Sequence, residues 1–179
     1  MGLFDFFKKE EKVEDLTLFN LQIGSILEYD LSTWVIKDKT DYDWGNNQFT
    51  FEYSVENGTD SAYIHIHDST PSKIDVSSGI KMFELGPEVK QTIVESDNPP
   101  KKITFKEIDY FLSDEFMGHC KSVNEDDDDW SKFVNWVFNN KDESEFVSIS
   151  RWGETEMDAV HGKYSKEFEF SNFLSSPKK

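Results

Sequence analysis

A strict alternation of apolar and polar residues, beginning at Phe49, constrains the fold more than any other feature of this chain. The apolar residues Phe51 and Val55 alternate with polar neighbours, which is the pattern of a strand with one face in a core. Asn57-Gly58 predicts a reversal of the chain, and the alternation resumes at Ala62. These residues therefore predict a β-hairpin.

The same hairpin pattern occurs a second time in residues 133–151. Aligned without a gap at an offset of 83 residues (134 minus 51), this segment places Trp136 on Tyr53 and Val147 on Ile64. Aromatic residues fall on aromatic residues several times, which indicates an internal repeat.

A smaller offset relates the segments upstream of the two hairpins. At 76 residues (110 minus 34), Tyr110 falls on Trp34 and Ile103 on Leu27. The two offsets differ by seven residues, and the difference falls at the acidic run 124–129. We therefore expect this run to be an insertion in a loop of the second copy.

The short elements and close reversals decide the fold class. They leave no room for the crossovers that parallel sheets require. We predict an all-β fold with a minor α part, built as two tandem antiparallel β-meander or small-barrel repeats packed with pseudo-two-fold symmetry. The expected parts are an N-terminal Phe-rich tail (1–17), the first β repeat (18–78), a helix and linker (79–102), the second β repeat (103–173) and a flexible C-terminus (174–179).

The linker carries the one clear helix signal. Pro87 suits the first turn of a helix, and Val89 and Ile93 lie one helical turn apart. Pro99-Pro100 would end any regular structure. A short helix is therefore expected between the two copies.

Composition limits both the core and the partners. Only 36% of the residues are hydrophobic, but 15% are aromatic, including 16 Phe and 5 Trp. Each buried ring removes a large area from water, so the predicted core is aromatic. The 36 acidic and 19 basic residues give a net charge of −17, which would repel the phosphates of nucleic acid. No nucleic-acid partner is expected.

Cysteine usage and hydropathy indicate the compartment. Cys120 is the only cysteine, so an internal disulfide and a cysteine-rich zinc site are excluded. No apolar run approaches the about 20 residues that crossing a bilayer requires, and the N-terminus lacks the pattern of a secretory signal. We expect a cytoplasmic protein.

The N-terminal tail carries an apolar cluster followed by charged residues. In a helix, Leu3, Phe6 and Phe7 would share one face, with Phe4 beside them. Such a face suits the groove of a protein partner or contact with a membrane surface. A tail that packs on its own domain is the alternative.

Several motifs of the chain resemble the bacterial domain of unknown function family 4178 (DUF4178). They are the run Leu18–Tyr29 with its Ile23-Gly24-Ser25 step, then Trp34-Val35-Ile36, Phe51-Glu52-Tyr53 and Tyr63-Ile64. The resemblance covers about Phe19 to Phe173 and implies a cytoplasmic, β-rich bacterial domain. Similar domains tend to be associated with membrane-stress and polyamine-type gene sets. The family implies no catalytic residues.

The strand that ends the first hairpin offers a metal-site hypothesis. Alternation places His65 and His67 together on one face, next to Asp68. Zinc needs three or four ligands, and the ungapped alignment places Ser148 and Ser150 at the two histidine positions. Two exposed strand histidines are the competing interpretation. Weak Ca²⁺ binding by the acidic run is a similar alternative to a solvated loop.

No catalytic set stands out. His119 adjoins Cys120, but neighbours in a strand point to opposite faces, so we expect a buried cysteine. Gly162 predicts the turn of a final hairpin, with His161 in that turn. Phosphate-binding glycine loops and nucleophile elbows are absent from the sequence. No catalytic residue and no cofactor are predicted, which favours a protein that is not an enzyme.

Tryptophans beside turns are the predicted contact surface. Trp44, Trp130 and Trp152 adjoin turns, and exposed rings on a rigid sheet are common anchors for partners. The sequence therefore favours a non-catalytic binding or scaffold module with a protein partner, of open oligomeric state. One alternative is a metal-dependent enzyme or metal sensor that uses the two strand histidines. Another is a binder of a small, polyamine-like cation between the repeats.

Overall fold

A computed structural model describes residues 15–67, 72–124 and 130–176, and it confirms an all-β fold with a single α-helix among these residues. The first five strands are β1 (Ile26–Tyr29), β2 (Ser32–Asp43), β3 (Phe49–Glu56), β4 (Ser61–His67) and β5 (Lys73–Ile80). The short helix η1 (Met82–Leu85) and α1 (Pro87–Ser96) follow. The remaining elements are β6 (Lys102–Phe105), β7 (Ile108–Ser122), β8 (Ser131–Asn140), β9 (Glu145–Arg151), β10 (Met157–Ser165), η2 (Glu167–Glu169) and β11 (Phe170–Leu174).

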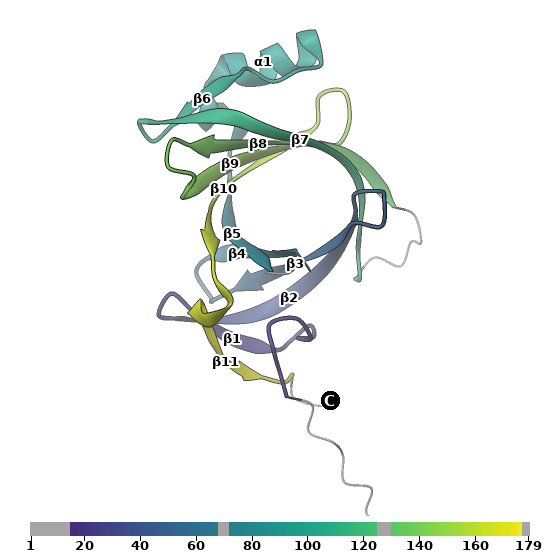
Figure 1. The fold of residues 1–179 in the computed structure, drawn as a ribbon, viewed down its shortest axis with the longest axis vertical. Coiled ribbons are helices and arrows are strands. Elements are labelled where there is room, and N and C mark those ends of the chain that lie inside the picture. The colour runs from purple at the N-terminus through teal and green to yellow at the C-terminus, as the bar shows by residue number, and fades with distance from the viewer. Residues whose placement is uncertain (1–14, 68–71, 125–129, 177–179) are drawn as a thin grey trace, which may run out of the picture.

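All eleven strands belong to one antiparallel sheet, in the order β11-β1-β2-β3-β4-β5-β10-β9-β8-β7-β6. Because β2 also pairs with β7, the eight strands from β2 to β7 in this order close into a ring (Figure 1). We call β1–β5 the first series of strands and β6–β10 the second series. The expectation of two packed sheets or small barrels differs from this result, since both series contribute strands to a single ring. Two contacts join the series, the β5–β10 seam and the β2–β7 seam.

The two series of five strands have matching pairings. Leu27 pairs with Trp34 in the first series, and Ile103 pairs with Tyr110 in the second. An irregularity lies between residues 36 and 38 of β2, and another between residues 112 and 114 of β7. The offset of 76 residues relates each of these features. An origin by duplication stays a prediction.

The ungapped alignment of the two hairpins is wrong by two residues. Tyr53 pairs with Ile64 across the first hairpin, whereas Trp136 pairs with Ile149 across the second. Each strand of the second hairpin is one residue longer next to the loop, and both loops have four residues. A shift of two residues keeps every side chain on its face, so alternation alone does not reveal it.

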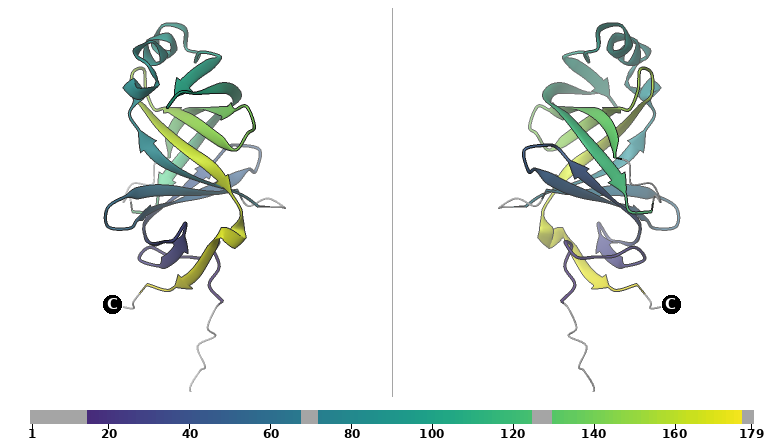
Figure 2. Two further views of the ribbon diagram at one scale, coloured as in Figure 1. Left: turned by 90° about the vertical axis from the view of Figure 1, so that its left-hand side faces the viewer. Right: turned by 90° about the vertical axis from the view of Figure 1, so that its right-hand side faces the viewer.

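Two separate hydrophobic cores lie outside the ring, at opposite ends of the long axis (Figures 1 and 2). In the first, Leu18 and Phe170 pack with Tyr53 on the outer face of the ring. In the second, Val89 of α1 packs with Trp136. Aromatic rings such as Tyr53 and Trp136 are almost completely buried, but aliphatic residues outnumber them in both cores, so the prediction of an aromatic core is only partly correct.

The linker helix lies where the sequence predicts it. Pro87 occupies the first turn of α1, and the helix ends at Ser96, before the left-handed Asp97. Val89 and Ile93 are its buried residues. The helix therefore covers the outer face of the second series of strands.

The predicted final hairpin around Gly162 is wrong. β10 runs without interruption through this residue, and Gly162 pairs with Ser77 across the β5–β10 seam. A Cβ atom on Gly162 would lie 2.6 Å from the Val76 carbonyl oxygen and 2.7 Å from the Ser77 Cβ atom. The glycine therefore permits close approach of two strands, and His161 lies within a strand rather than in a turn.

Candidate functional site

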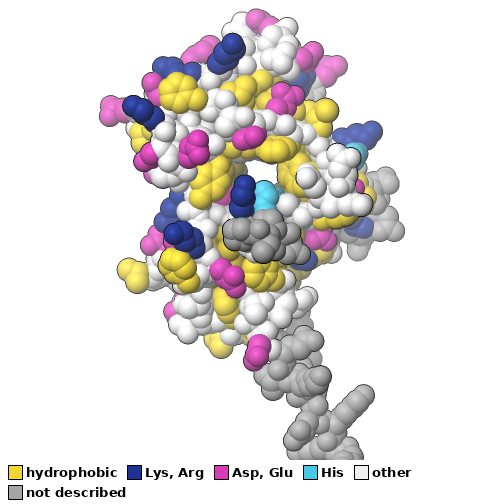
Figure 3. All heavy atoms as spheres, in the orientation of Figure 1, with side chains coloured by type: hydrophobic (Ala, Val, Ile, Leu, Met, Phe, Trp, Pro, Cys, Tyr) yellow, Lys and Arg dark blue, Asp and Glu magenta, His cyan; other side chains and the backbone are white. Residues whose placement is uncertain are grey.

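The interior of the ring is lined by the strand faces that point away from the two cores. Antiparallel neighbours share a face, so Glu52, His65, Asp75 and Tyr164, which follow one another in register across β3, β4, β5 and β10, all lie on this inner face. Figure 3 shows an opening through the middle of the molecule, with a histidine and a basic side chain at its edge. An eight-stranded ring has room for packed side chains or for one small ligand.

A hydrogen-bonded network surrounds His65. Its Nδ1 atom lies 3.5 Å from the Glu52 carboxylate, and its Nε2 atom lies 2.8 Å from the Thr50 hydroxyl oxygen. Trp44 donates its indole N–H to the same hydroxyl (2.7 Å), and the Tyr42 hydroxyl donates to Glu52 (3.2 Å). The side chain of His65 is only 12% exposed. The expectation of an exposed histidine is therefore wrong at this position.

Neighbouring charges act on the protonation of His65. Burial lowers its pKa, but the hydrogen bond to Glu52 and the charges of Asp75 and Glu52 outweigh burial, so the pKa of His65 is raised. His67 lies beside it, 3.6 Å from Asp75. Two carboxylates therefore face two imidazoles.

Further carboxylates act on two inner tyrosines. Burial, with the charges of Glu52 and Asp158, raises the pKa of Tyr63. Burial, with the charges of Asp75 and Asp114, raises the pKa of Tyr164 to about 12. The four carboxylates Glu52, Asp75, Asp114 and Asp158 therefore make the interior an acidic environment. We call these four groups the interior carboxylates.

Five aromatic rings line the interior beside the β2–β7 seam. This aromatic cluster consists of Tyr42, Trp44, Phe116, Phe133 and Trp152. Trp44 stacks on Tyr42 with ring centroids 5.6 Å apart and lies 5.3 Å from Phe133, which in turn lies 4.9 Å from Trp152. Tyr42 also lies 5.0 Å from the ring of His65. The cluster therefore adjoins the His65 network directly.

The predicted tryptophan surface is not a single surface. Trp44 and Trp152 are half-buried and meet through Phe133, and the Trp152 indole N–H bonds Asp158 at 3.0 Å. Trp130 is 42% exposed and stays a candidate anchor. The predicted tail residues Leu3, Phe4, Phe6 and Phe7 lie outside the described residues.

The structure shows only part of the predicted metal site. His65 and His67 share a face as predicted, with ring centroids 4.8 Å apart. Asp68 lies outside the described residues, as do residues 125–129 of the acidic run. Within residues 15–67, 72–124 and 130–176, no three His, Cys, Asp or Glu side chains are placed to hold a metal ion.

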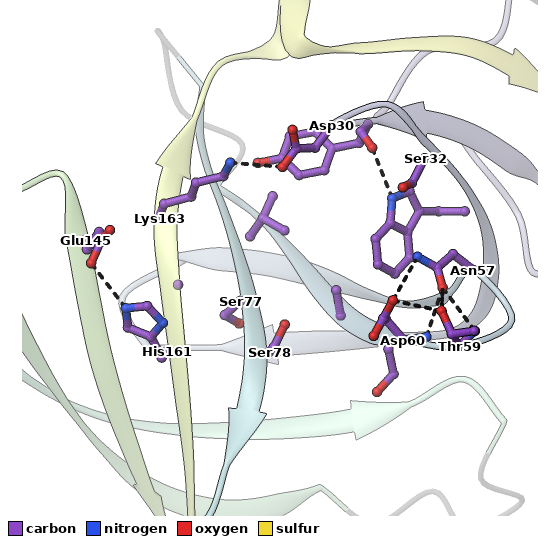
Figure 4. A pocket seen from close by; sticks show the side chains of 16 residues that line it. Asp30, Ser32, Asn57, Thr59, Asp60, Ser77, Ser78, Glu145, His161 and Lys163 are labelled. Atoms are coloured by element: carbon purple, nitrogen blue, oxygen red, sulfur yellow. Dashed lines mark hydrogen bonds and ion pairs between the residues drawn. The ribbon is translucent and has the colours of Figure 1, made fainter. Parts of the chain in front are cut away.

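A second concave region lies on the outer surface, at the β5–β10 seam (Figure 4). This seam pocket encloses about 660 Å³ and is lined from both series of strands, including Trp34, Asp60 and Lys163. At one side His161 lies 3.3 Å from Glu145. The buried Tyr110 donates its hydroxyl to Glu145 (2.9 Å) and lies 3.0 Å from His161.

Comparison with known proteins adds a family. The family model described as "Domain of unknown function (DUF4178)" matches residues 22–167. The chain belongs to the DUF4178 family. A relative from Aquifex aeolicus (strain VF5), described as an uncharacterized protein, is 27% identical over 173 residues, which cover 94% of this chain and 93% of the relative. No solved structure matches.

Two further observations complete the description of this DUF4178 protein. None of its helices within the described ranges has the length and apolar character needed to cross a lipid bilayer. The interior residues Tyr42, Phe133 and Asp75 were not singled out from the sequence. These residues lie on the strand face opposite the core residues. In sequence such a face is indistinguishable from one that faces solvent, and only closure of the ring places it in the interior.

Proposed function

We propose that this DUF4178 protein is a non-catalytic binding module whose ring interior holds a small organic cation. One observation carries the proposal: strand register places the interior carboxylates on the same inner face as the aromatic cluster, around an open interior, while both hydrophobic cores lie outside it. An open polar interior contributes little to folding. Its polar and aromatic groups are instead available to bind a ligand.

The charge of the interior favours a cation. Glu52 and Asp75 face His65 and His67, while Asp158 and Asp114 act on Tyr63 and Tyr164. Low-dielectric walls focus the field of like charges and raise the local concentration of an oppositely charged ligand. The net charge of −17 acts in the same direction. An ammonium group is a chemical match for this field.

The aromatic cluster favours an organic cation over a simple metal ion. A cation held over the face of Trp or Tyr gains about 0.5 to 2 kcal/mol. Among the described residues, the lysine-to-ring contacts involve Tyr29, Phe51, Phe83, Phe105 and Phe168, and none involves the cluster. The described chain brings the imidazole of His65 to the cluster, 5.0 Å from the Tyr42 ring, and a ligand cation would share the cluster with it.

The setting and the partners belong to the same proposal. We place the protein in the cytoplasm, because Cys120 is the single cysteine of the sequence and the fold uses no internal disulfide. Trp130 supports an additional protein contact, since its side chain is exposed directly before β8. Neither point is needed for the ligand site.

Calorimetric titration with putrescine, spermidine and tetramethylammonium tests the cation site, with 1,4-butanediol as the neutral comparison. We expect the amines to bind and the diol not to bind. Glu52→Gln and Asp75→Asn should each weaken amine binding by about tenfold, which corresponds to about 1.4 kcal/mol. Asp109→Asn is the matched control, because Asp109 pairs with Lys102 outside the ring.

Two results would contradict the proposal. Equal amine affinity in the wild type and in a Glu52→Gln, Asp75→Asn double variant would place the amines outside the interior. Absence of any heat or thermal stabilisation with all three amines would remove the organic-cation class altogether. Circular dichroism of each variant shows whether the fold is intact.

A further inference from the structure

The seam pocket differs from the ring interior in position and in the presence of a lysine, Lys163, which pairs with Asp30. It lies on the outer face where β5 meets β10, between the two hydrophobic cores, and draws residues from the turn after β1, the turn after β3 and from β10. Its volume of about 660 Å³ falls within the about 300 to 1,000 Å³ of small-molecule sites. The seam pocket is therefore large enough for a small-molecule ligand of its own.

Every charged side chain labelled in Figure 4 already has a partner within the pocket wall. Lys163 lies 3.4 Å from Asp30 and 5.4 Å from the centre of the Tyr29 ring. His161 lies 3.3 Å from Glu145. A ligand with a net charge would have to compete with one of these pairs. A neutral ligand would leave them in place.

Asp60 is held in a fixed position by its own turn. It accepts a hydrogen bond from the Thr59 hydroxyl (2.9 Å) and one from the Asn57 amide (3.4 Å). A carboxylate has about four lone-pair sites, so Asp60 keeps acceptor capacity toward the pocket. It is placed to accept hydrogen bonds from ligand hydroxyl groups.

The rest of the wall combines hydroxyl groups with one large ring. Ser32, Ser61 and Ser78 line the pocket, and each hydroxyl can donate and accept a hydrogen bond. Trp34 lines it as well and is fixed by a hydrogen bond from its indole N–H to the Tyr29 carbonyl oxygen (3.2 Å). A fixed indole beside polar groups suits a ligand with an apolar C–H face and a rim of hydroxyls.

We infer that the seam pocket is a binding site for a neutral polyhydroxylated ligand of the sugar or polyol class. The ring of Trp34 contacts the C–H face of the ligand, Asp60 accepts hydrogen bonds from its hydroxyls, and Ser78 exchanges hydrogen bonds with it from the pocket floor. Lys163 and His161 each lie beside a carboxylate of the wall, so a ligand without charge leaves both contacts in place. This site is independent of the cation site in the ring interior.

Nitrogen-15 NMR of the full chain tests the inference, with glucose, trehalose and myo-inositol as probes up to about 50 mM, the range in which millimolar sites saturate. At least one probe should give a saturable shift of the Trp34 indole N–H signal and of the Ser78 amide signal. Trp34→Phe assigns the indole signal. Ser78→Trp fills the pocket from an exposed strand position and should abolish saturation.

Asp60→Ala removes the principal acceptor at an exposed turn and should weaken binding by about tenfold. Glu52→Gln, in the ring interior, is the matched control and should leave the sugar titration unchanged. Absence of saturable shifts for all three probes would overturn the inference, as would saturation that survives Ser78→Trp. Weaker amine binding in Glu52→Gln with an unchanged sugar titration would separate the two proposals.

Discussion

The inner faces of the two series of strands differ, although their outer faces agree. In the first series, Glu52 pairs with His65, and in the second the corresponding pair is Asn135 with Ser150. The Asn135 amide donates to the Ser148 hydroxyl (2.7 Å) and to the Ser150 hydroxyl (3.0 Å). A charged network in one half thus stands opposite a neutral network in the other.

The outer faces have no such difference. Tyr53 is buried at the first core and Trp136 at the second, each central to its cluster. Equivalent strand pairing therefore requires apolar residues on the outside of the ring, and it leaves the inside free to vary. The part of the molecule that differs between its halves is the part where we place the ligand.

The largest effects should come from the outer face, equally in both halves. Tyr53→Ala and Trp136→Ala should each reduce the free energy of unfolding by about 3 to 5 kcal/mol, because each empties a packed core site. Urea denaturation measures both. The Tyr53 hydroxyl donates to the Leu21 carbonyl oxygen (3.2 Å), whereas the Trp136 indole N–H has no hydrogen-bond partner within the described part of the chain. A loss below about 1 kcal/mol in either variant would show that the halves do not carry equal cores.

The next effect concerns the β5–β10 seam, where the halves meet. Gly162→Val should lower the free energy of unfolding by about 1 to 3 kcal/mol, because the added atoms overlap Val76 and Ser77. Gly79→Val is a matched control in the same seam, since a Cβ atom there would meet nothing within 4 Å. Equal midpoints of urea unfolding for the two variants would contradict close packing at this seam.

The outer face of the ring was predictable from sequence because alternation identifies which residues are apolar. The aromatic core residues Tyr53 and Trp136, and the helix at Pro87, follow from patterns within one segment. Closure of the ring does not, because the pairing of β2 with β7 joins residues about 80 positions apart and leaves no local mark. Gly162 illustrates the same limit, since a glycine signals a turn as readily as a close approach of strands.

The candidate site was predictable in some of its members but not in its assembly. The sequence predicts Trp44 and Trp152 as parts of one contact surface and His65 as a candidate metal ligand. Phe133 brings the two tryptophans together, and it was read only as part of an alternating strand. Whether an alternating strand turns its polar face to solvent or to an enclosed interior depends on the whole sheet.

A smaller effect should separate the two inner networks. Thr50→Val keeps the shape of the side chain but leaves the Trp44 indole N–H without its acceptor and His65 without its Nε2 partner. We expect a loss of about 1 to 2 kcal/mol in the free energy of unfolding. Asn135→Ala in the second series removes an amide between two hydroxyls and should cost about 1 kcal/mol. Urea denaturation measures both losses. A larger loss in Asn135→Ala than in Thr50→Val would show that the charged network does not contribute more to stability than the neutral one.

The smallest effect is the pH dependence that His65 gives to stability. Its pKa in the folded chain is raised above the ordinary value, so its stabilising contribution is complete below about pH 6.5 and is lost as the pH rises through the folded-state pKa. Burial lowers the pKa of His65 while Glu52 and Asp75 raise it, so the net rise in pKa is the difference between opposing effects. Urea midpoints at acidic and alkaline pH should therefore differ more in the wild type than in His65→Gln. His161→Gln is the matched control outside the ring, and an unchanged difference in His65→Gln would show that the charged network does not bind a proton on folding.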